Sequence, residues 1–234
     1  MKLMGVNPIP DDVAAAIEEC WPDGVIEEFD ADESYFHDIH AAVERDLGRI
    51  AHARLLWQTP AVDEPAFKSY YIFFLAPEGG EFESETETEN FGPEDPEDPD
   101  TDVVTVMVPG KGTCGCSVVV SYASPFAAVA FCEYAQYEDG SDATPDPCNF
   151  KYFDEQTGER TDPAAHYRNT LGEGPFAELE KLRAGIAKVL AEHGVVVLDQ
   201  AILDLPASHL KADGDVFLEG KRISAGDAFF FRGV

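Results

Sequence analysis

Glutamates alternate with neutral residues in one stretch near the middle of the chain, and this spacing can collect negative charge on one side. The stretch contains Glu81, Glu83, Glu85, Glu87 and Glu89, separated by Phe, Ser and Thr residues. Because successive side chains of an extended chain point to opposite sides, these carboxylates would share one side, about 6.6 Å apart. Such a row attracts cations and basic proteins.

The acidic stretch continues into a segment with proline at every third position, Pro93, Pro96 and Pro99. This is the period of a polyproline II helix, so a stiff acidic rod is one interpretation. A solvated loop, kept extended by its own charge, is the other. We include its acidic residues with the five alternating glutamates as candidate partner-binding residues: Glu94, Asp95, Glu97, Asp98, Asp100 and Asp102.

The overall charge points to the same kind of partner. The 234 residues include 46 Asp and Glu against 16 Lys and Arg, a formal net charge of −30. Nucleic acid and anionic membranes are therefore excluded as expected ligands, because both require clustered basic side chains. Acidity also serves solubility or salt tolerance. However, the range 78–102 holds 12 acidic residues and no basic one, which favours a local role.

Other reactive residues form no recognisable catalytic or metal-binding signature. Cys114 and Cys116 lack the second CxxC pair that a structural zinc site needs, and we expect buried free thiols there and at Cys132 and Cys148. His37 and His40 lie three residues apart without an evident third ligand. We expect no metal and no cofactor, and an enzyme with an unrecognised site stays open as an alternative.

Periodicity and turn residues predict the elements that would position the acidic stretch. Apolar residues at helical spacing indicate helices from Pro10 to about Trp21, from about residue 34 to 56, and over residues 175–193. Aromatic and β-branched runs indicate strands at 67–75 and 126–137, and a hairpin that joins 103–108 to 117–122 through PGKGTCG. Residues 78–102 then read as an acidic loop insertion.

These elements predict a single α+β domain over residues 1–234, with an antiparallel sheet of about four to six strands packed against two main helices. The chain shows no signal-peptide pattern and no apolar run of membrane-spanning length, so we expect a cytoplasmic protein. The expected function is an acidic binding or inhibitor protein that captures a basic protein partner, such as an immunity-type protein that neutralises a nuclease toxin. A housekeeping or salt-adapted protein with a functionally silent acidic loop is the alternative.

Overall fold

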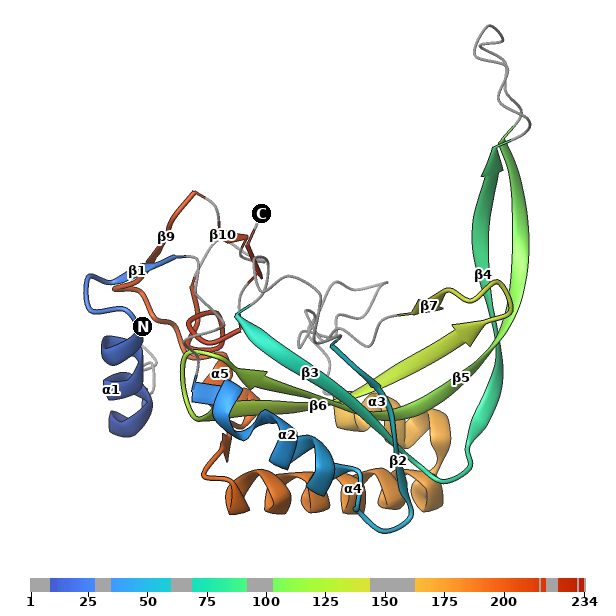
Figure 1. The fold of residues 1–234 in the computed structure, drawn as a ribbon, viewed down its shortest axis with the longest axis horizontal. Coiled ribbons are helices and arrows are strands. Elements are labelled where there is room, and N and C mark those ends of the chain that lie inside the picture. Colours follow the sequence, from blue (N-terminus) through green and yellow to red (C-terminus); the bar gives the residue numbers. More distant parts are fainter. Residues whose placement is uncertain are drawn as a thin grey trace, which may run out of the picture.

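A mostly antiparallel, seven-stranded sheet packs against two main helices, so the fold is α+β as predicted (Figure 1). The computed structural model describes residues 9–27, 35–59, 69–91, 103–143, 163–214, 216–217, 223–230 and 232–233. The strands run in the order β2 (Ala53–Gln58), β3 (Tyr70–Pro77), β5 (Val103–Ser121), β6 (Phe126–Tyr137) and β7 (Asp142–Ala143). Strand β4 (Glu81–Phe91) also pairs with β5, and β8 (Val196–Val197) pairs in parallel with β6.

The helices cover one face of this sheet. Helices α2 (Tyr35–Leu47) and α4 (Glu173–Glu192) lie below it in Figure 1, with α3 (Pro163–Leu171) at one end. Alternate residues of β3 and β5 point toward them and form the main core with the apolar stripes of α2 and α4. This core includes Phe73, Leu75, Val118, Val120, Phe36, Val43, Leu47, Phe176, Leu179 and Ile186, all at most 2% exposed.

A second apolar cluster joins the N-terminal helix to the C-terminal segments. Helix α1 (Asp11–Cys20) and β1 (Val25–Ile26) pack against the region of α5 (Gln200–Leu203) and β9 (Lys211–Ala212), and β1 pairs with β9 in parallel. Strands β10 (Val216–Phe217) and β11 (Arg232–Gly233) form a separate short pair. The indole nitrogen of Trp21 donates a hydrogen bond of 2.8 Å to the carbonyl of Ala228.

The predicted second helix is too long at its C-terminal end. Helix α2 stops at Leu47, and His52 adopts a left-handed backbone with φ 61°. Residues 53–58 then form β2 and pair with β3. The apolar residues at 50–55 fit a helical period and also pack against the sheet, so the local pattern did not reveal the change of element.

The predicted hairpin within residues 103–122 is wrong, because these residues form one strand of 19 residues, β5. Its glycines lie where neighbouring atoms leave no room for a side chain. A Cβ on Gly115 would lie 2.3 Å from the carbonyl oxygen of Leu75, and one on Gly112 would lie 2.3 Å from the ring of Phe82. The glycines therefore mark close approaches inside a strand rather than a turn.

Part of the expected loop at 78–102 is an ordered strand, β4. Strands β3 and β4 lie on the same edge of β5, and Gly79 and Gly80, with φ of 85° and 80°, make the bend between them. Residues 81–91 pair with 113–103 along their whole length, so the charged alternation belongs to a β-strand. Residues 92–102 lie outside the described residues. The single-domain organisation stays a prediction.

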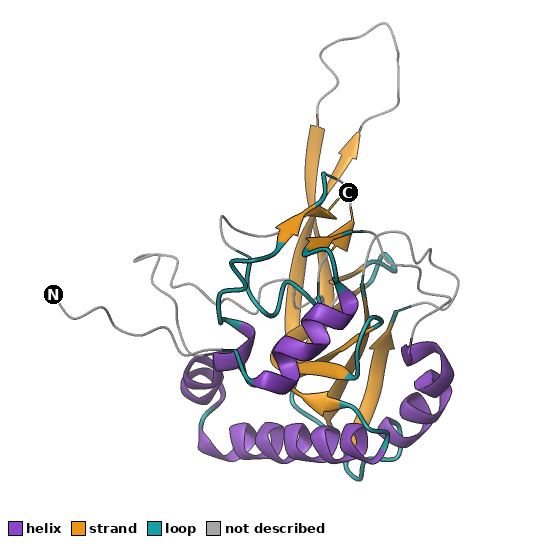
Figure 2. Cartoon of the chain, turned by 90° about the vertical axis from the view of Figure 1, so that its left-hand side faces the viewer, coloured by secondary structure: helices purple, strands orange, loops and turns teal. Residues whose placement is uncertain are grey.

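Strands β4 and β5 together form a two-stranded ribbon that extends away from the helices (Figures 1 and 2). The register with β6 begins at residue 110 of β5, and Pro109 also accepts a hydrogen bond from Glu138, so residues 103–108 pair with β4 alone among the described residues. We call the paired residues 81–91 and 103–113 the acidic ribbon.

Candidate functional site

The acidic ribbon presents the predicted carboxylates in one row. Glu81, Glu83, Glu85 and Glu87 occupy alternate positions of β4, and all four side chains are exposed. Glu89 belongs to the same strand by its backbone. Their partners on β5 are Thr113, Lys111, Pro109, Met107 and Thr105. Three of the four exposed glutamates, Glu81, Glu85 and Glu87, thus lie opposite neutral residues. Among the described residues, only Glu81 of these three forms an ion pair, with Arg54.

The row faces away from the helices. Cys114 belongs to the main core on the helix-covered side, so its neighbour Thr113 and the residues aligned with Thr113 point to the opposite side. Glu81 lies opposite Thr113 and therefore outside the core. Its carboxylate forms an ion pair with Arg54 at 3.2 Å. The sheet thus separates an apolar, helix-covered face from a charged one.

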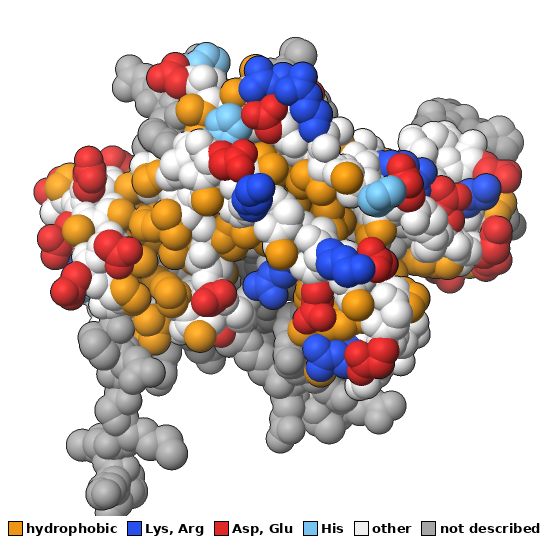
Figure 3. All heavy atoms as spheres, turned by 90° about the horizontal axis from the view of Figure 1, so that it is seen from below, with side chains coloured by type: hydrophobic (Ala, Val, Ile, Leu, Met, Phe, Trp, Pro, Cys, Tyr) orange, Lys and Arg blue, Asp and Glu red, His pale blue; other side chains and the backbone are white. Residues whose placement is uncertain are grey.

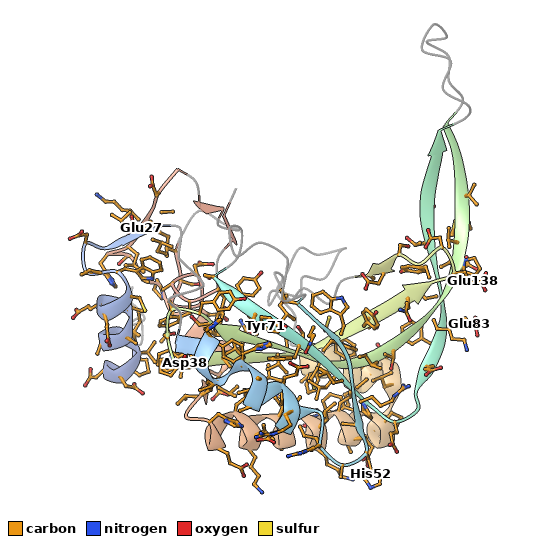
Figure 4. The ribbon with its side chains drawn as sticks, in the orientation of Figure 1. Glu27, Asp38, His52, Tyr71, Glu83 and Glu138 are labelled. Carbon is orange, nitrogen blue, oxygen red and sulfur yellow. The ribbon has the colours of Figure 1, made fainter. Side chains whose placement is uncertain are left out.

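Glu83 is the end of a polar row that crosses four strands. The register aligns Glu83 with Lys111, Lys111 with Gln136, and Gln136 with Asp142 of β7. The Asp142 carboxylate also accepts a hydrogen bond of 3.4 Å from the hydroxyl of Tyr134. Glu83 and Glu138 lie at the base of the ribbon, far from Glu27 at the other end of the molecule (Figure 4). In this row, Lys111 and Gln136 separate the carboxylate of Glu83 from that of Asp142.

At the base of the ribbon, two aromatic rings pack directly over glycines of β5. The Phe82 ring occupies the place of a side chain at Gly112, and Tyr137 and the Gln136 carbonyl do so at Gly110. Phe82 stays 36% exposed. The Phe82 contact joins β4 to β5 on the side opposite the glutamates, and the Tyr137 contact joins β6 to β5, so the carboxylates stay in solvent.

On the helix side of the molecule, the left-hand end in Figure 3 shows Asp and Glu without Lys or Arg. Over the centre and the right-hand end of this face, basic and acidic side chains lie next to each other (Figure 3). The ion pairs of this region include Arg45 with Asp46 at 2.9 Å and Lys181 with Glu178 at 2.6 Å. Lys111 is the basic residue within the acidic ribbon, and it lies opposite Glu83. From outside the ribbon, Arg54 forms the one described ion pair with it, to Glu81.

The structure brings only part of the predicted set together. Glu94, Asp95, Glu97, Asp98, Asp100 and Asp102 lie outside the described residues, so their role stays a prediction. Two further acidic residues, Glu133 and Asp139, lie away from this row. Glu133 lies across from Cys114 on the helix-covered face, and Asp139 accepts hydrogen bonds from the backbone and hydroxyl of Ser141 in a turn.

The described cysteines form no disulfide, and burial suppresses the ionisation of Cys114 and Cys116. Cys20, Cys114, Cys116 and Cys132 form no disulfide, and Cys148 lies outside the described residues. Burial raises the pKa of Cys116 to about 12. Burial and the nearby Glu133 carboxylate raise the pKa of Cys114 to about 12. Reactive thiols need a lowered pKa, so these two are poor nucleophiles.

A cluster between α2 and the sheet contains side chains that the sequence had not connected. The rings of His40 and Tyr71 lie 4.3 Å apart, and the Tyr71 hydroxyl donates a hydrogen bond to the carbonyl of Thr59. Burial lowers the pKa of His40, with His37 acting in the same direction and Glu44 against it. Helical spacing alone showed that His37 and His40 share a face. The contact of His40 with Tyr71 depends on how β3 packs against α2, which the sequence pattern does not show.

An apolar cavity lies where the bend between β3 and β4 meets α4. It has a volume of about 320 Å³ and is lined by Gly79, Gly80, Cys114, Gly174 and Leu179 among others. Its lining is mainly apolar, and its thiol is poorly nucleophilic because its pKa is raised. Two carboxylate residues, Glu78 and Glu178, also line it.

Within the described ranges, no three His, Cys, Asp or Glu side chains come close enough to hold a metal ion. The helices of these ranges also include none with the length and hydrophobicity required to cross a membrane. Comparisons of the chain with protein families, with curated proteins and with solved structures find no match.

Proposed function

We propose that this chain is a binding protein that captures a basic protein partner through the acidic ribbon. The observation that carries the proposal is the row of Glu81, Glu83, Glu85 and Glu87, exposed and held in one direction by a continuous β-ladder. An ordered row loses less conformational entropy on binding than a flexible acidic tail. Its field also accelerates encounter with a positively charged surface.

A nuclease is one class of partner that fits this chemistry. An enzyme that binds nucleic acid must display Lys and Arg toward phosphates. An acidic ribbon that occupies such a surface would block substrate binding, as an immunity-type inhibitor does. The net charge of −30 favours this class over nucleic acid itself as the ligand.

The test compares two double variants with equal changes of net charge. Glu85→Lys/Glu87→Lys reverses the ribbon, and Glu18→Lys/Glu19→Lys reverses exposed residues of α1 at the other end of the molecule. The partner is first captured from the source cell with the wild-type protein and then purified. Its affinity is measured for each variant at increasing NaCl concentrations, and its nuclease activity is measured with and without the wild-type protein.

We expect the ribbon variant to bind at least about tenfold more weakly than wild type, which corresponds to about 1.4 kcal/mol. The α1 variant should retain most of the affinity, since exposed charges beyond about 10 Å are screened at moderate salt. A captured partner without excess positive charge, or equal losses in the two variants, would contradict the proposal. The functionally silent acidic segment of a salt-adapted protein would then be the better interpretation.

A further inference from the structure

Strand β4 is an edge strand of the sheet. It pairs with β5 through all eleven residues, and no described strand pairs with its outer edge. An edge of this kind offers backbone donors and acceptors to any extended chain that can lie beside it. Its length in extended form is about 36 Å at 3.3 Å per residue, enough for several pairs of hydrogen bonds.

A single hydrogen bond shows which residues of β4 offer these groups. The carbonyl of Pro109 accepts a 2.9 Å hydrogen bond from the N–H of Glu138, on the β6 side of β5. The carbonyl of Pro109 therefore points away from β4, and proline has no N–H to donate. Glu85, which is opposite Pro109, must then direct its own N–H and C=O to the outer edge.

The same alternation applies along the strand. Backbone groups of residues two apart point in the same direction, so Glu81, Glu83 and Glu87 also present their N–H and C=O outward. The residues between them direct these groups toward β5. The row that carries the carboxylates is thus also the row that carries the available hydrogen-bonding groups.

Because the same residues carry the carboxylates and the outward backbone groups, the residue pattern of an added strand follows. In an antiparallel pairing, the residue opposite each outward-directed glutamate exchanges both backbone hydrogen bonds with it, with the two Cα atoms about 5.5 Å apart. Both side chains lie on the same face. Because the two strands share the same repeat, Lys or Arg at every second position of the incoming strand would lie opposite successive glutamates.

The carboxylates also exclude a second copy of this chain. Two β4 edges paired antiparallel would bring glutamate against glutamate, and like charges directly opposite each other are destabilising. Charged residues on an edge strand are a common protection against such pairing. A basic segment meets no such repulsion, so the same residues reject one occupant and favour the other.

We propose that β4 binds an extended segment of its partner as an additional antiparallel strand, with Lys or Arg at alternate positions opposite Glu81, Glu83, Glu85 and Glu87. This inference rests on the proposed function and specifies the form of the partner. Capture by charge alone would accept any basic surface. Strand addition requires a basic segment with a period of two residues and free backbone N–H groups at the basic positions.

Two synthetic peptides of equal composition test the periodicity. One alternates Lys and Thr, and the other contains the same residues in blocks of two, so that no register places Lys opposite every glutamate. Binding to the full chain is measured by fluorescence anisotropy at low and moderate salt. We expect the alternating peptide to bind at least about fivefold more tightly, since each cross-strand charge pair contributes about 0.2–1 kcal/mol.

Backbone N-methylation tests the hydrogen bonds directly. Methylating the lysine positions of the alternating peptide removes the N–H groups that would bond to β4, whereas methylating the threonine positions removes groups that point to solvent. The first peptide should lose at least about tenfold in affinity and the second much less. Equal affinity of the two methylated peptides, or of the alternating and blocked peptides, would overturn strand addition. So would the failure of every peptide to bind.

A pair of variants tests the same bond from the protein side. Glu85→Ala removes one carboxylate, and Glu85→Pro removes in addition an N–H that the fold does not use. Proline is tolerated on an edge strand where the N–H faces solvent. Circular dichroism should show both variants folded, with the proline variant binding the alternating peptide at least about tenfold more weakly than the alanine variant. Equal binding would also overturn strand addition.

These outcomes separate the two levels of the proposal. If peptides bind according to charge alone, and Glu85→Lys/Glu87→Lys weakens all of them equally, electrostatic capture stands and strand addition fails. If the natural partner is insensitive to that double variant, the proposed function fails whatever the peptides do.

Discussion

The aromatic ring of Phe82 lies over Gly112, at the position that a side chain of residue 112 would occupy. A comparable contact exists deeper in the sheet, where the Leu75 carbonyl oxygen is 2.3 Å from a Cβ built on Gly115. The two glycines differ in what surrounds them. Phe82 is a half-exposed side chain that can rotate, whereas the backbone of Leu75 and the buried ring of Phe74 cannot move easily.

This difference predicts unequal costs for two identical substitutions. Gly115→Ala should lower the free energy of unfolding by at least about 2 kcal/mol, in the upper range for overpacking. Gly112→Ala should cost about 1 kcal/mol or less because Phe82 can move aside. Urea unfolding measures both. When Phe82 is also replaced by alanine, Gly112→Ala should no longer lower the free energy of unfolding. Equal costs at 112 and 115 would contradict the stated geometry.

The hydrogen bond from Trp21 to Ala228 should be needed for the terminal cluster. Trp21→Phe keeps an aromatic ring but leaves a buried carbonyl without its donor, which costs about 1–3 kcal/mol. The chain has two tryptophans, Trp21 and Trp57. In a Trp57→Phe variant, the tryptophan fluorescence therefore comes from Trp21 alone and reports the unfolding of this cluster. Unfolding followed by circular dichroism measures the loss. A Trp21→Phe variant as stable as wild type would show that the bond contributes little.

Acidification should weaken the packing around His40. Burial lowers the pKa of His40 below 6.5, so the unfolded chain takes up a proton more readily than the folded one. The contribution of neutral His40 to stability is therefore complete above about pH 6.5 and decreases as the pH falls below that value. His37 and Glu44 on α2 and Tyr71 on β3 are the titratable groups that face it.

The measurement is the free energy of unfolding between pH 7.5 and 4.5 for wild type and His40→Gln. The variant lacks the proton uptake, so wild type should lose more stability over this interval than the variant does. His166→Gln, an exposed position on α3, is the matched control and should follow wild type. Parallel pH profiles for wild type and His40→Gln would rule out this role of burial.

The thiols of Cys114 and Cys116 should resist alkylation in the folded protein. Their pKa values of about 12 leave little thiolate at pH 8, and both side chains are buried. Iodoacetamide labelling followed by mass spectrometry should modify them much more slowly in buffer than in urea. Rapid labelling of Cys114 in the folded state would indicate that the cavity at the base of β4 admits solvent.

Sequence patterns predicted the fold class because each main element carries its own local signal. Strand β6 has the predicted bounds, Phe126–Tyr137, since aromatic residues recur along it and no glycine or proline interrupts it. Helix α4 was predicted almost to the residue, and Gly194, with φ 79°, follows it as the sequence suggested.

The hairpin error and the loop error in the sheet share one physical cause, which is that glycine can mark either a turn or a close approach inside a strand. In PGKGTCG, glycines suggested a turn, but they permit close contact with Phe82, Tyr137 and Leu75 from neighbouring strands. Those neighbours are distant in sequence, so only the tertiary fold reveals them. Assigning the glycines to a turn also removed the partner of residues 81–91, and the glutamates then read as a loop. Their alternation, which requires only a local period of two, was recognisable from the sequence.

The contact between Trp21 and Ala228 also bears on how the chain folds during synthesis. Helix α1 emerges from the ribosome early, yet the residues against which Val13, Ile17 and Trp21 pack include Leu203 and Phe229, which are made roughly 190–210 residues later. Until then the apolar side of α1 lacks those partners. Nascent chains stopped before residue 200 should therefore be more sensitive to protease at α1 than at the β5–β6 pair, whose strands adjoin in sequence and can associate as soon as both have left the exit tunnel.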